Sequence, residues 1–322
     1  MWVGAWVAST ALIVALARAV DVARLSRTLV GVDWRWLAAA VAANLLILPL
    51  GAQQWRILLP AAARITRRRI TGLFAMTSVA NNTTPALVGH AAGLLLLAAE
   101  PTIGQMAALS VFVLDQAAAG LAKIAVLAVA SAVAPMPGWM RSGMIALVVG
   151  VSALVVTVAV AAHQHEIVAR WSARTAVGSR VRRMLDLLFG WIRALEAARD
   201  PRRFVGGFAY ALLVRAAEAG GIIAVQIAFG MTPTIASVFL VLSATALSSL
   251  VPITPANIGP YEAAAFAAYR ALGLSAEAAL GIAAAQHVCL LTAAVVPGYL
   301  VLTGRRWSPS SADPEPERTG MH

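Results

Sequence analysis

The sequence has 322 residues, of which 60% are hydrophobic and 12% charged, with a formal net charge of +11. Soluble proteins carry about 25% charged residues, so this composition excludes an ordinary water-soluble globule. The single cysteine, Cys289, excludes an internal disulfide and a cysteine-based metal cluster.

Apolar segments recur along the whole chain. A membrane-spanning helix needs about 20 mostly apolar residues. The segments are roughly 2–18, 36–55, 70–98, 103–134, 142–162, 204–229, 234–273 and 275–303. They predict an all-α, polytopic integral membrane bundle of six to eight membrane helices. We expect a single membrane domain over residues 1–303, beginning with a retained span because no basic residue precedes it, and a disordered cytoplasmic tail over 304–322.

Most basic residues lie between the apolar segments, notably in 51–69 and 163–203. Basic clusters beside spans face the cytoplasm, which predicts a multi-pass protein of the cell membrane with lipids as partners. Nucleic-acid binding is not expected, because the clusters flank spans and no soluble module accompanies them. In 163–203, arginines alternate with apolar residues, which fits either a helix on the membrane surface or a solvated linker helix.

Two apolar segments are interrupted by helix-breaking residues. Segment 70–98 breaks at residues 81–85 (Asn-Asn-Thr-Thr-Pro), and segment 234–273 breaks at 252–260, which holds three prolines. Proline removes a backbone donor and clashes with the preceding turn. Arginine-rich turns mark the other connections, but no Arg or Lys adjoins either break. We therefore expect re-entrant or broken helices within the membrane rather than external loops.

The two breaks resemble each other in sequence. Residues 84–89 (Thr-Pro-Ala-Leu-Val-Gly) match 254–259 (Thr-Pro-Ala-Asn-Ile-Gly) at an offset of 170 positions. The same offset maps Ser78 onto Ser248 and Gln116 onto Gln286. This predicts two repeats, about 1–135 and 136–303. Three crossings in each repeat would make the copies inverted and put both termini on one side, at the cost of placing the basic connection 18–35 outside.

Several polar groups lie inside the predicted spans. Ionisable groups in hydrocarbon cost about 2.5–3.5 kcal/mol or more, so they usually face a cavity or a partner. Lys123 shares a helix face with Gln116, and it either faces a cavity or packs locally with its amine at the interface. Glu262 follows the second break, where it suits a headgroup or a helix cap. The interior histidines are His90 and His287, and a histidine within a span can relay protons.

These observations predict a shared polar groove near the midplane. The expected substrate-binding residues are Asn81, Asn82, Thr84, His90, Asp115, Gln116, Thr254, Asn257, Glu262 and Gln286. The expected structural residues are Pro85, Gly89, Pro252, Pro255 and Gly259, together with Arg215 and Glu218, whose spacing of three suits an intrahelical ion pair. We expect no metal and no cofactor. Because Gly-rich phosphate loops and the HExxH and GxSxG motifs are missing, we also expect no enzymatic activity.

The second break carries a recognisable motif. Residues 249–262 (Ser-Leu-Val-Pro-Ile-Thr-Pro-Ala-Asn-Ile-Gly-Pro-Tyr-Glu) resemble the C-terminal signature of the lysylphosphatidylglycerol synthetase transmembrane-region family, Pro-Ile-Thr-Pro-Gly-Gly-Ile-Gly followed by Glu. Residues 81–89 resemble the family's earlier Asn…Leu-Pro-Gly-Arg-Ala-Gly-Glu element. The pair Asp115-Gln116 falls where the family often has an acidic residue and Arg. The resemblance covers about residues 5–303.

The resemblance implies a flippase-like domain. In the multiple peptide resistance factor this domain moves aminoacylated phosphatidylglycerol between leaflets, and stand-alone members are linked to lipid, hopanoid or glycolipid export. The family's Arg and Glu in the first element are Leu87 and His90 here, and its Arg after the acidic residue is Gln116. These departures remove charge and argue against lysyl-phosphatidylglycerol as the substrate. The short tail gives no expectation of aminoacyl transfer.

Three functions follow as hypotheses. The leading one is a translocator that moves a polar-headed lipid between leaflets through the groove. It would work by rocking one repeat against the other and draw on a proton or the membrane potential. The second is a non-catalytic membrane partner of a lipid-modifying or glycosyl-transferring enzyme. The third is a membrane-embedded transferase that acts on a lipid-linked substrate.

Overall fold

The computed structural model describes residues 31–60, 63–84, 86–172, 200–250 and 254–304, and within these ranges it contains helices and no strand. The helices are α3 (Trp34–Leu45), α4 (Ile47–Leu58), α5 (Arg67–Thr83), α6 (Ala86–Ala98), α7 (Gly104–Val133), α8 (Gly138–Ser172), α11 (Pro201–Ala228), α12 (Ile235–Ser248), the 3-10 helix η1 (Pro255–Asn257), α13 (Pro260–Ala271) and α14 (Ala276–Gly304). The expected first span 2–18, Pro85, Pro252 and the tail 305–322 lie outside the described residues.

Among the described residues, five helical stretches are long and apolar enough to cross a membrane. They are Trp34–Leu58, Gly104–Val133, Gly138–Thr157, Pro201–Ala228 and Ala276–Thr303. They correspond to five predicted segments, so the prediction of a polytopic helical membrane protein is confirmed. α3 and α4 form one of these stretches with a turn at Leu46. α8 ends at Ser172, ten residues past the end predicted at residue 162, so residues 163–172 belong to this helix. Most of the remaining connection that was predicted as a surface or linker helix, residues 173–199, lies outside the described residues.

The helices begin where capping residues stand in the polar connections. The Thr66 hydroxyl accepts a hydrogen bond from the Arg69 backbone N–H at 3.3 Å, and the Asp200 carboxylate accepts one from the Arg202 N–H at 3.0 Å. At the start of α12, Thr234 and Ser237 each cap the backbone of the other. A side-chain acceptor satisfies an N–H that the first turn leaves unpaired, so these residues fix where the helices begin.

The first break is a helical hairpin. α5 ends at Thr83, and Thr84 is extended, with φ −124° and ψ 164°. The residue before a proline is pushed out of the α region, so the Thr-Pro pair ends the helix. α6 then packs back along α5. An added Cβ on Gly89 would lie 2.5 Å from the Asn81 Cα, so this glycine is what lets the two helices approach so closely.

The second break repeats this arrangement with a longer interruption. Thr254 precedes Pro255 and is again extended, with φ −108° and ψ 145°. Ala256 and Asn257 have φ values of 55° and 56°, and Gly259 has φ 96°. α13 then packs against α12. α12 has 14 residues and α13 has 12, which gives rises of about 21 and 18 Å. Both are shorter than the hydrocarbon core of about 30 Å, as expected for a re-entrant hairpin.

The two halves of the described chain share an order of elements. A spanning stretch (Trp34–Leu58 or α11) is followed by a hairpin (α5–α6 or α12–α13) and then by another span (α7 or α14). η1 in the second break contacts both α5 and α6, so the two breaks meet in space. The assignment of repeats 1–135 and 136–303 and their inverted orientation stay predictions.

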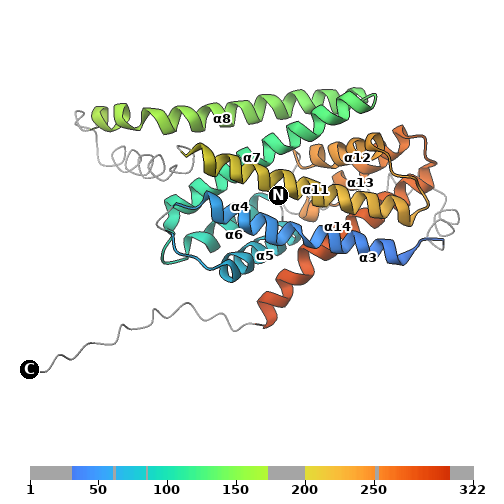
Figure 1. Ribbon diagram of the computed structural model, residues 1–322, viewed down its shortest axis with the longest axis horizontal. Helices are drawn as coiled ribbons and strands as arrows, with labels where there is room; N and C mark the ends of the chain where they lie inside the picture. The colour runs from blue at the N-terminus through green and yellow to red at the C-terminus, as the bar shows by residue number, and fades with distance from the viewer. Residues whose placement is uncertain (1–30, 61–62, 85, 173–199, 251–253, 305–322) are drawn as a thin grey trace, which may run out of the picture.

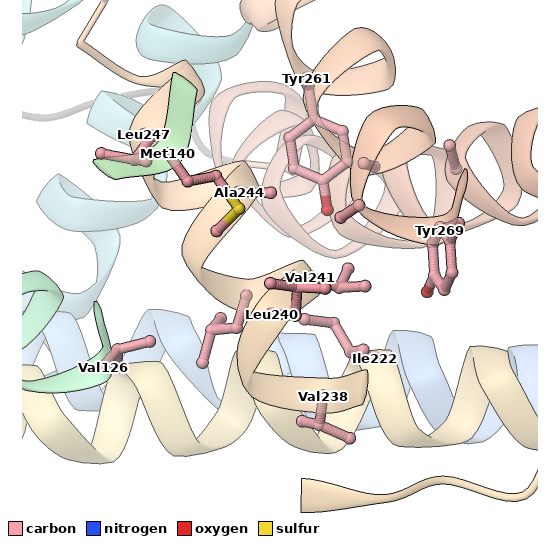
Figure 2. Packing of buried hydrophobic residues seen from close by; sticks show 14 of the residues in the cluster. Val126, Met140, Ile222, Val238, Leu240, Val241, Ala244, Leu247, Tyr261 and Tyr269 are labelled. Carbon is pink, nitrogen blue, oxygen red and sulfur yellow. The ribbon is translucent and has the colours of Figure 1, made fainter. Parts of the chain in front are cut away.

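The helices pack mainly through aliphatic side chains. Figure 1 shows α8 along one edge of the bundle and α11 running beside α3 and α4, both of which it contacts. In Figure 2, Ala244 and Leu247 of α12 lie beside Met140 of α8, while Val241 lies close to Ile222 of α11.

Candidate functional site

A cavity of about 580 Å³ lies where the two breaks meet. Cavities of about 300–1,000 Å³ are the size of small-molecule sites. Both halves of the chain contribute to its wall. The lining residues are Asn44, Asn81, Asn82, His90, Phe112, Gln116, Ala119, Lys123, Arg215, Glu218, Ile222, Leu242, Thr245, Ala246, Ser249, Thr254, Ala256, Asn257, Tyr261, Gln286, His287 and Leu290.

The first break contributes amides and a histidine. Asn81 and Asn82 stand in the last turn of α5, where the Asn82 amide donates to the Ser78 carbonyl at 2.8 Å. The Asn81 Oδ1 is buried and has no hydrogen-bond partner among the described residues. His90 lies on α6, with its ring edge-on to Phe112 of α7 at 5.3 Å between centroids. Helix ends and side-chain amides thus give this wall hydrogen-bonding capacity.

The second break is held by a clamp between Glu262 and His287. The Glu262 Oε2 accepts from the Gly259 backbone N–H at 2.7 Å, and its Oε1 lies 2.7 Å from the His287 Nδ1. The other ring nitrogen, Nε2, lies 3.0 Å from the Ala256 carbonyl oxygen. Both ring nitrogens of His287 thus lie within hydrogen-bond distance of an oxygen atom. The clamp ties the left-handed turn at Ala256 to α13 and α14.

Two tyrosines and a glutamine extend this clamp. Tyr269 donates its hydroxyl hydrogen to the Gln286 Oε1 at 2.8 Å, and the Gln286 amide donates to the Tyr261 hydroxyl oxygen at 2.7 Å. The Tyr261 ring stacks on His287, with centroids 4.1 Å apart and planes at 18°. Buried polar groups are costly unless they are paired, so this series of hydrogen bonds fixes the polar face of α14 against α13.

Charged groups of α7 and α11 also reach the cavity. The Arg215 Nη1 and Glu218 Oε2 lie 2.6 Å apart, which is the intrahelical ion pair that the spacing predicted. Lys123 reaches from α7 to α12, where its Nζ donates to the Ser249 Oγ at 2.7 Å. The Lys123 side chain is thus among the residues that line the cavity.

The structure brings most of the predicted site residues together. Seven of the ten line the cavity: Asn81, Asn82, His90, Gln116, Thr254, Asn257 and Gln286. Whether they bind a substrate stays a prediction.

Three predicted residues are not among those that line the cavity. The Thr84 hydroxyl turns back to the Ala80 carbonyl at 2.7 Å. The Asp115 Oδ1 accepts from the Gln54 amide of α4 at 2.9 Å, which draws it away from the cavity. Glu262 stands behind His287 as the cap of α13. Each is a hydrogen-bonded support for a neighbouring helix.

Several lining residues are not among the substrate-binding residues expected from the sequence. Asn44, Tyr261 and Ser249 were not singled out, and Arg215 and Glu218 were assigned a structural role alone. Asn44, Arg215 and Glu218 lie far from both breaks in the sequence, whereas Ser249 and Tyr261 flank the second break. The sequence did indicate a cavity-facing position for Lys123 and His287, because charged or titratable groups within a membrane span usually face a cavity.

The described residues contain no group of three or more His, Cys, Asp or Glu side chains placed to hold a metal ion. The cavity donors are mainly amides, hydroxyls and cationic side chains, which suits hydrogen bonding to a polar ligand better than metal coordination.

The fold and the cavity define the class of protein: a polytopic helical membrane protein with two hairpins that meet at a cavity lined by polar and apolar side chains. The family model for the lysylphosphatidylglycerol synthase TM region matches residues 1–298, and the chain belongs to this family. No curated protein and no solved structure matched the chain in the other two comparisons.

Proposed function

We propose that the protein is a lipid translocator that moves a polar-headed lipid between the two leaflets of the cell membrane. The observation that carries this proposal is the meeting of two hairpins from distant parts of the chain at one polar cavity of about 580 Å³. The family, named for the membrane region of a lipid synthase, supports a role linked to membrane lipids.

The physical argument starts from the cost of polar groups in a membrane. Irregular backbone and charged side chains are tolerated at membrane depth where they line a water-filled cavity or are buried in protein. Asn81, Asn257, Lys123 and Arg215 come from both halves and line one space. Such a space lowers the barrier for a headgroup, which otherwise crosses hydrocarbon without hydrogen-bond partners. The acyl chains remain in the bilayer.

The hairpins also suggest how access could alternate. Each hairpin connects to the following span, α7 or α14, and the contact between η1 and the α5–α6 pair joins the two halves. Rocking of one half against the other around a fixed central site is the usual scheme for such architectures. In this proposal the chain acts as a transporter and not as an enzyme.

The test is a purified protein in liposomes that contain a fluorescent lipid in both leaflets. An impermeant reductant added outside quenches the outer leaflet, and continued quenching reports movement from the inner leaflet. We expect quenching beyond the outer-leaflet fraction for the wild type. Protein-free liposomes give the baseline.

A cavity-blocking variant gives the matched comparison. Ala119 lines the cavity, whereas Ala146 is exposed on α8. Ala119→Trp should abolish movement of the lipid, while Ala146→Trp should leave it unchanged. Equal activity of both variants, or no activity of folded wild-type protein, would contradict the proposal. Turnover of a lipid-linked donor by the protein in detergent would instead indicate a transferase.

A further inference from the structure

Lys123 is the single lysine of the sequence, and it lies within a membrane-spanning helix. Its ammonium donates to the Oγ of Ser249, the residue that follows the last turn of α12, at 2.7 Å. The serine hydroxyl donates its own hydrogen to the Ala246 carbonyl at 2.7 Å. Ser249 therefore acts as an acceptor that orients the ammonium without neutralising its charge.

The Lys123 ammonium can donate further hydrogen bonds. A lysine ammonium has three donors. Among the described residues, Lys123 makes this one hydrogen bond and has no carboxylate within ion-pair distance. Arg215 repels the ammonium, while Glu218 and Asp115 attract it. Two of its donors therefore remain for a ligand in the cavity.

The neighbouring charges do not remove this excess. Arg215 and Glu218 pair with each other at 2.6 Å, which uses the carboxylate that lines the cavity. Asp115 accepts amide hydrogens from Gln54 and Gln116, and it does not line the cavity. The C-terminal end of α12 carries about half a negative charge, which offsets the ammonium in part. Among the described Lys, Arg, Asp and Glu side chains that line the cavity, two are therefore cations, Lys123 and Arg215, and one is a carboxylate, Glu218.

We propose that Lys123 and Ser249 form an anion subsite that takes the phosphate of a lipid headgroup. This inference rests on the proposed function and names the chemistry of its substrate. An ammonium is a compact point charge that binds phosphate oxygens well, and charge-assisted bonds are stronger than neutral ones. The amides of Asn81, Asn82 and Gln116 face the same cavity and would bind the uncharged part of the headgroup.

The structural alternative is that Lys123 caps the C-terminal end of α12 and does nothing else. Lys123→Gln separates the two roles, because an amide N–H can still donate to Ser249 but carries no charge. Lys123→Arg keeps the charge. The matched control is Arg141→Gln, which removes one positive charge from an exposed position on α8 outside the cavity.

The experiment measures binding by calorimetry to the full chain in a non-ionic detergent. The probes are dihexanoyl phosphatidylglycerol, dihexanoylglycerol without phosphate, and inorganic phosphate. We expect the wild type to bind the phospholipid at least about tenfold more tightly than the other two probes. Lys123→Gln should lose this difference, while Lys123→Arg and Arg141→Gln should keep it.

Each outcome decides the question. Equal phospholipid binding by wild type and Lys123→Gln overturns the subsite and leaves the helix cap. Tight binding of inorganic phosphate alone overturns the assignment to a lipid. If Lys123→Gln has a lowered melting temperature, Ser249→Ala provides the second variant, with an expected loss of affinity of about threefold to tenfold because the ammonium is less well oriented.

Binding in detergent is independent of movement between leaflets. Intact binding without translocation in liposomes would defeat the proposed function and leave the subsite. Translocation without any preference for a phosphate-bearing lipid would defeat the subsite and leave the proposed function.

Discussion

Glu262 and His287 are joined by a contact of 2.7 Å that spans 25 positions of sequence and fastens α13 to α14. The same carboxylate accepts the Gly259 N–H, and the same imidazole reaches the Ala256 carbonyl. One pair of side chains thus supports a turn with three residues at positive φ, namely Ala256, Asn257 and Gly259. Left-handed backbone is unfavourable for alanine, so the turn depends on this support.

The clamp predicts that Glu262→Ala destabilises the protein by about 2 kcal/mol. The substitution leaves the Gly259 N–H and the His287 Nδ1 without their partner. Glu262→Gln should cost about 1 kcal/mol or less, because an amide accepts from Gly259 and donates to a neutral imidazole. Unfolding curves in detergent, followed by circular dichroism, measure both. Equal losses for the two variants would show that hydrogen bonding is not what the residue supplies.

The hydrogen bonds that link Tyr269, Gln286 and Tyr261 predict a second effect on the free energy of unfolding. Tyr269→Phe removes the donor to the Gln286 Oε1 and leaves a buried acceptor unpaired, at a cost of about 1–3 kcal/mol. Tyr299→Phe is the control, because the Tyr299 side chain is 59% exposed on α14. It should change the free energy of unfolding by less than about 0.5 kcal/mol. A Tyr269→Phe protein as stable as this control would contradict the assignment of that bond.

The hairpins could be predicted from the sequence because their causes are local. A Thr-Pro pair ends a helix whatever surrounds it, since proline restricts the residue before it. Thr84 and Thr254 are accordingly extended at the two predicted breaks. Apolar length likewise predicted the five spans.

The directions of individual side chains could not be predicted in the same way. A pattern places Asp115 on α7 but does not say that Gln54, 61 positions earlier, draws its carboxylate toward α4. Lys123 meets Ser249 across 126 positions, a contact that follows from the packing of α7 against α12. Such contacts depend on tertiary structure, and hydrophobic periodicity carries no information about them.

The close approach of α6 to α5 predicts that Gly89→Ala is destabilising. The new Cβ would lie 2.5 Å from the Asn81 Cα and Oδ1, which forces the hairpin apart at a cost of about 1–3 kcal/mol. Gly150 of α8 has nothing within 4 Å of an added Cβ. Gly150→Ala should therefore stabilise its helix by about 0.5–1 kcal/mol. Melting temperatures that shift in the same direction for both variants would refute the steric argument.

The Arg215–Glu218 pair predicts strong coupling between two substitutions. Glu218→Gln leaves the guanidinium of Arg215 in the cavity wall without its carboxylate, and Arg215→Gln leaves the carboxylate alone. Each single variant should lose more than half of the free energy of unfolding that the double variant loses. The reason is that replacing both partners leaves no uncompensated charge. A double-mutant cycle in detergent should give a coupling free energy of about 1–3 kcal/mol.

The Arg215–Glu218 pair also predicts that removing the carboxylate of Glu218 raises the affinity for a phospholipid. Among the described lining residues, Glu218 is the sole carboxylate. Glu218→Gln makes the cavity more positive and frees the Arg215 guanidinium, whose planar donors fit a phosphate. Dihexanoyl phosphatidylglycerol should therefore bind this variant several times more tightly than the wild type, whereas dihexanoylglycerol should bind both equally. Weaker binding of the phospholipid would mean that Glu218 itself contacts the ligand, through a donor on the headgroup.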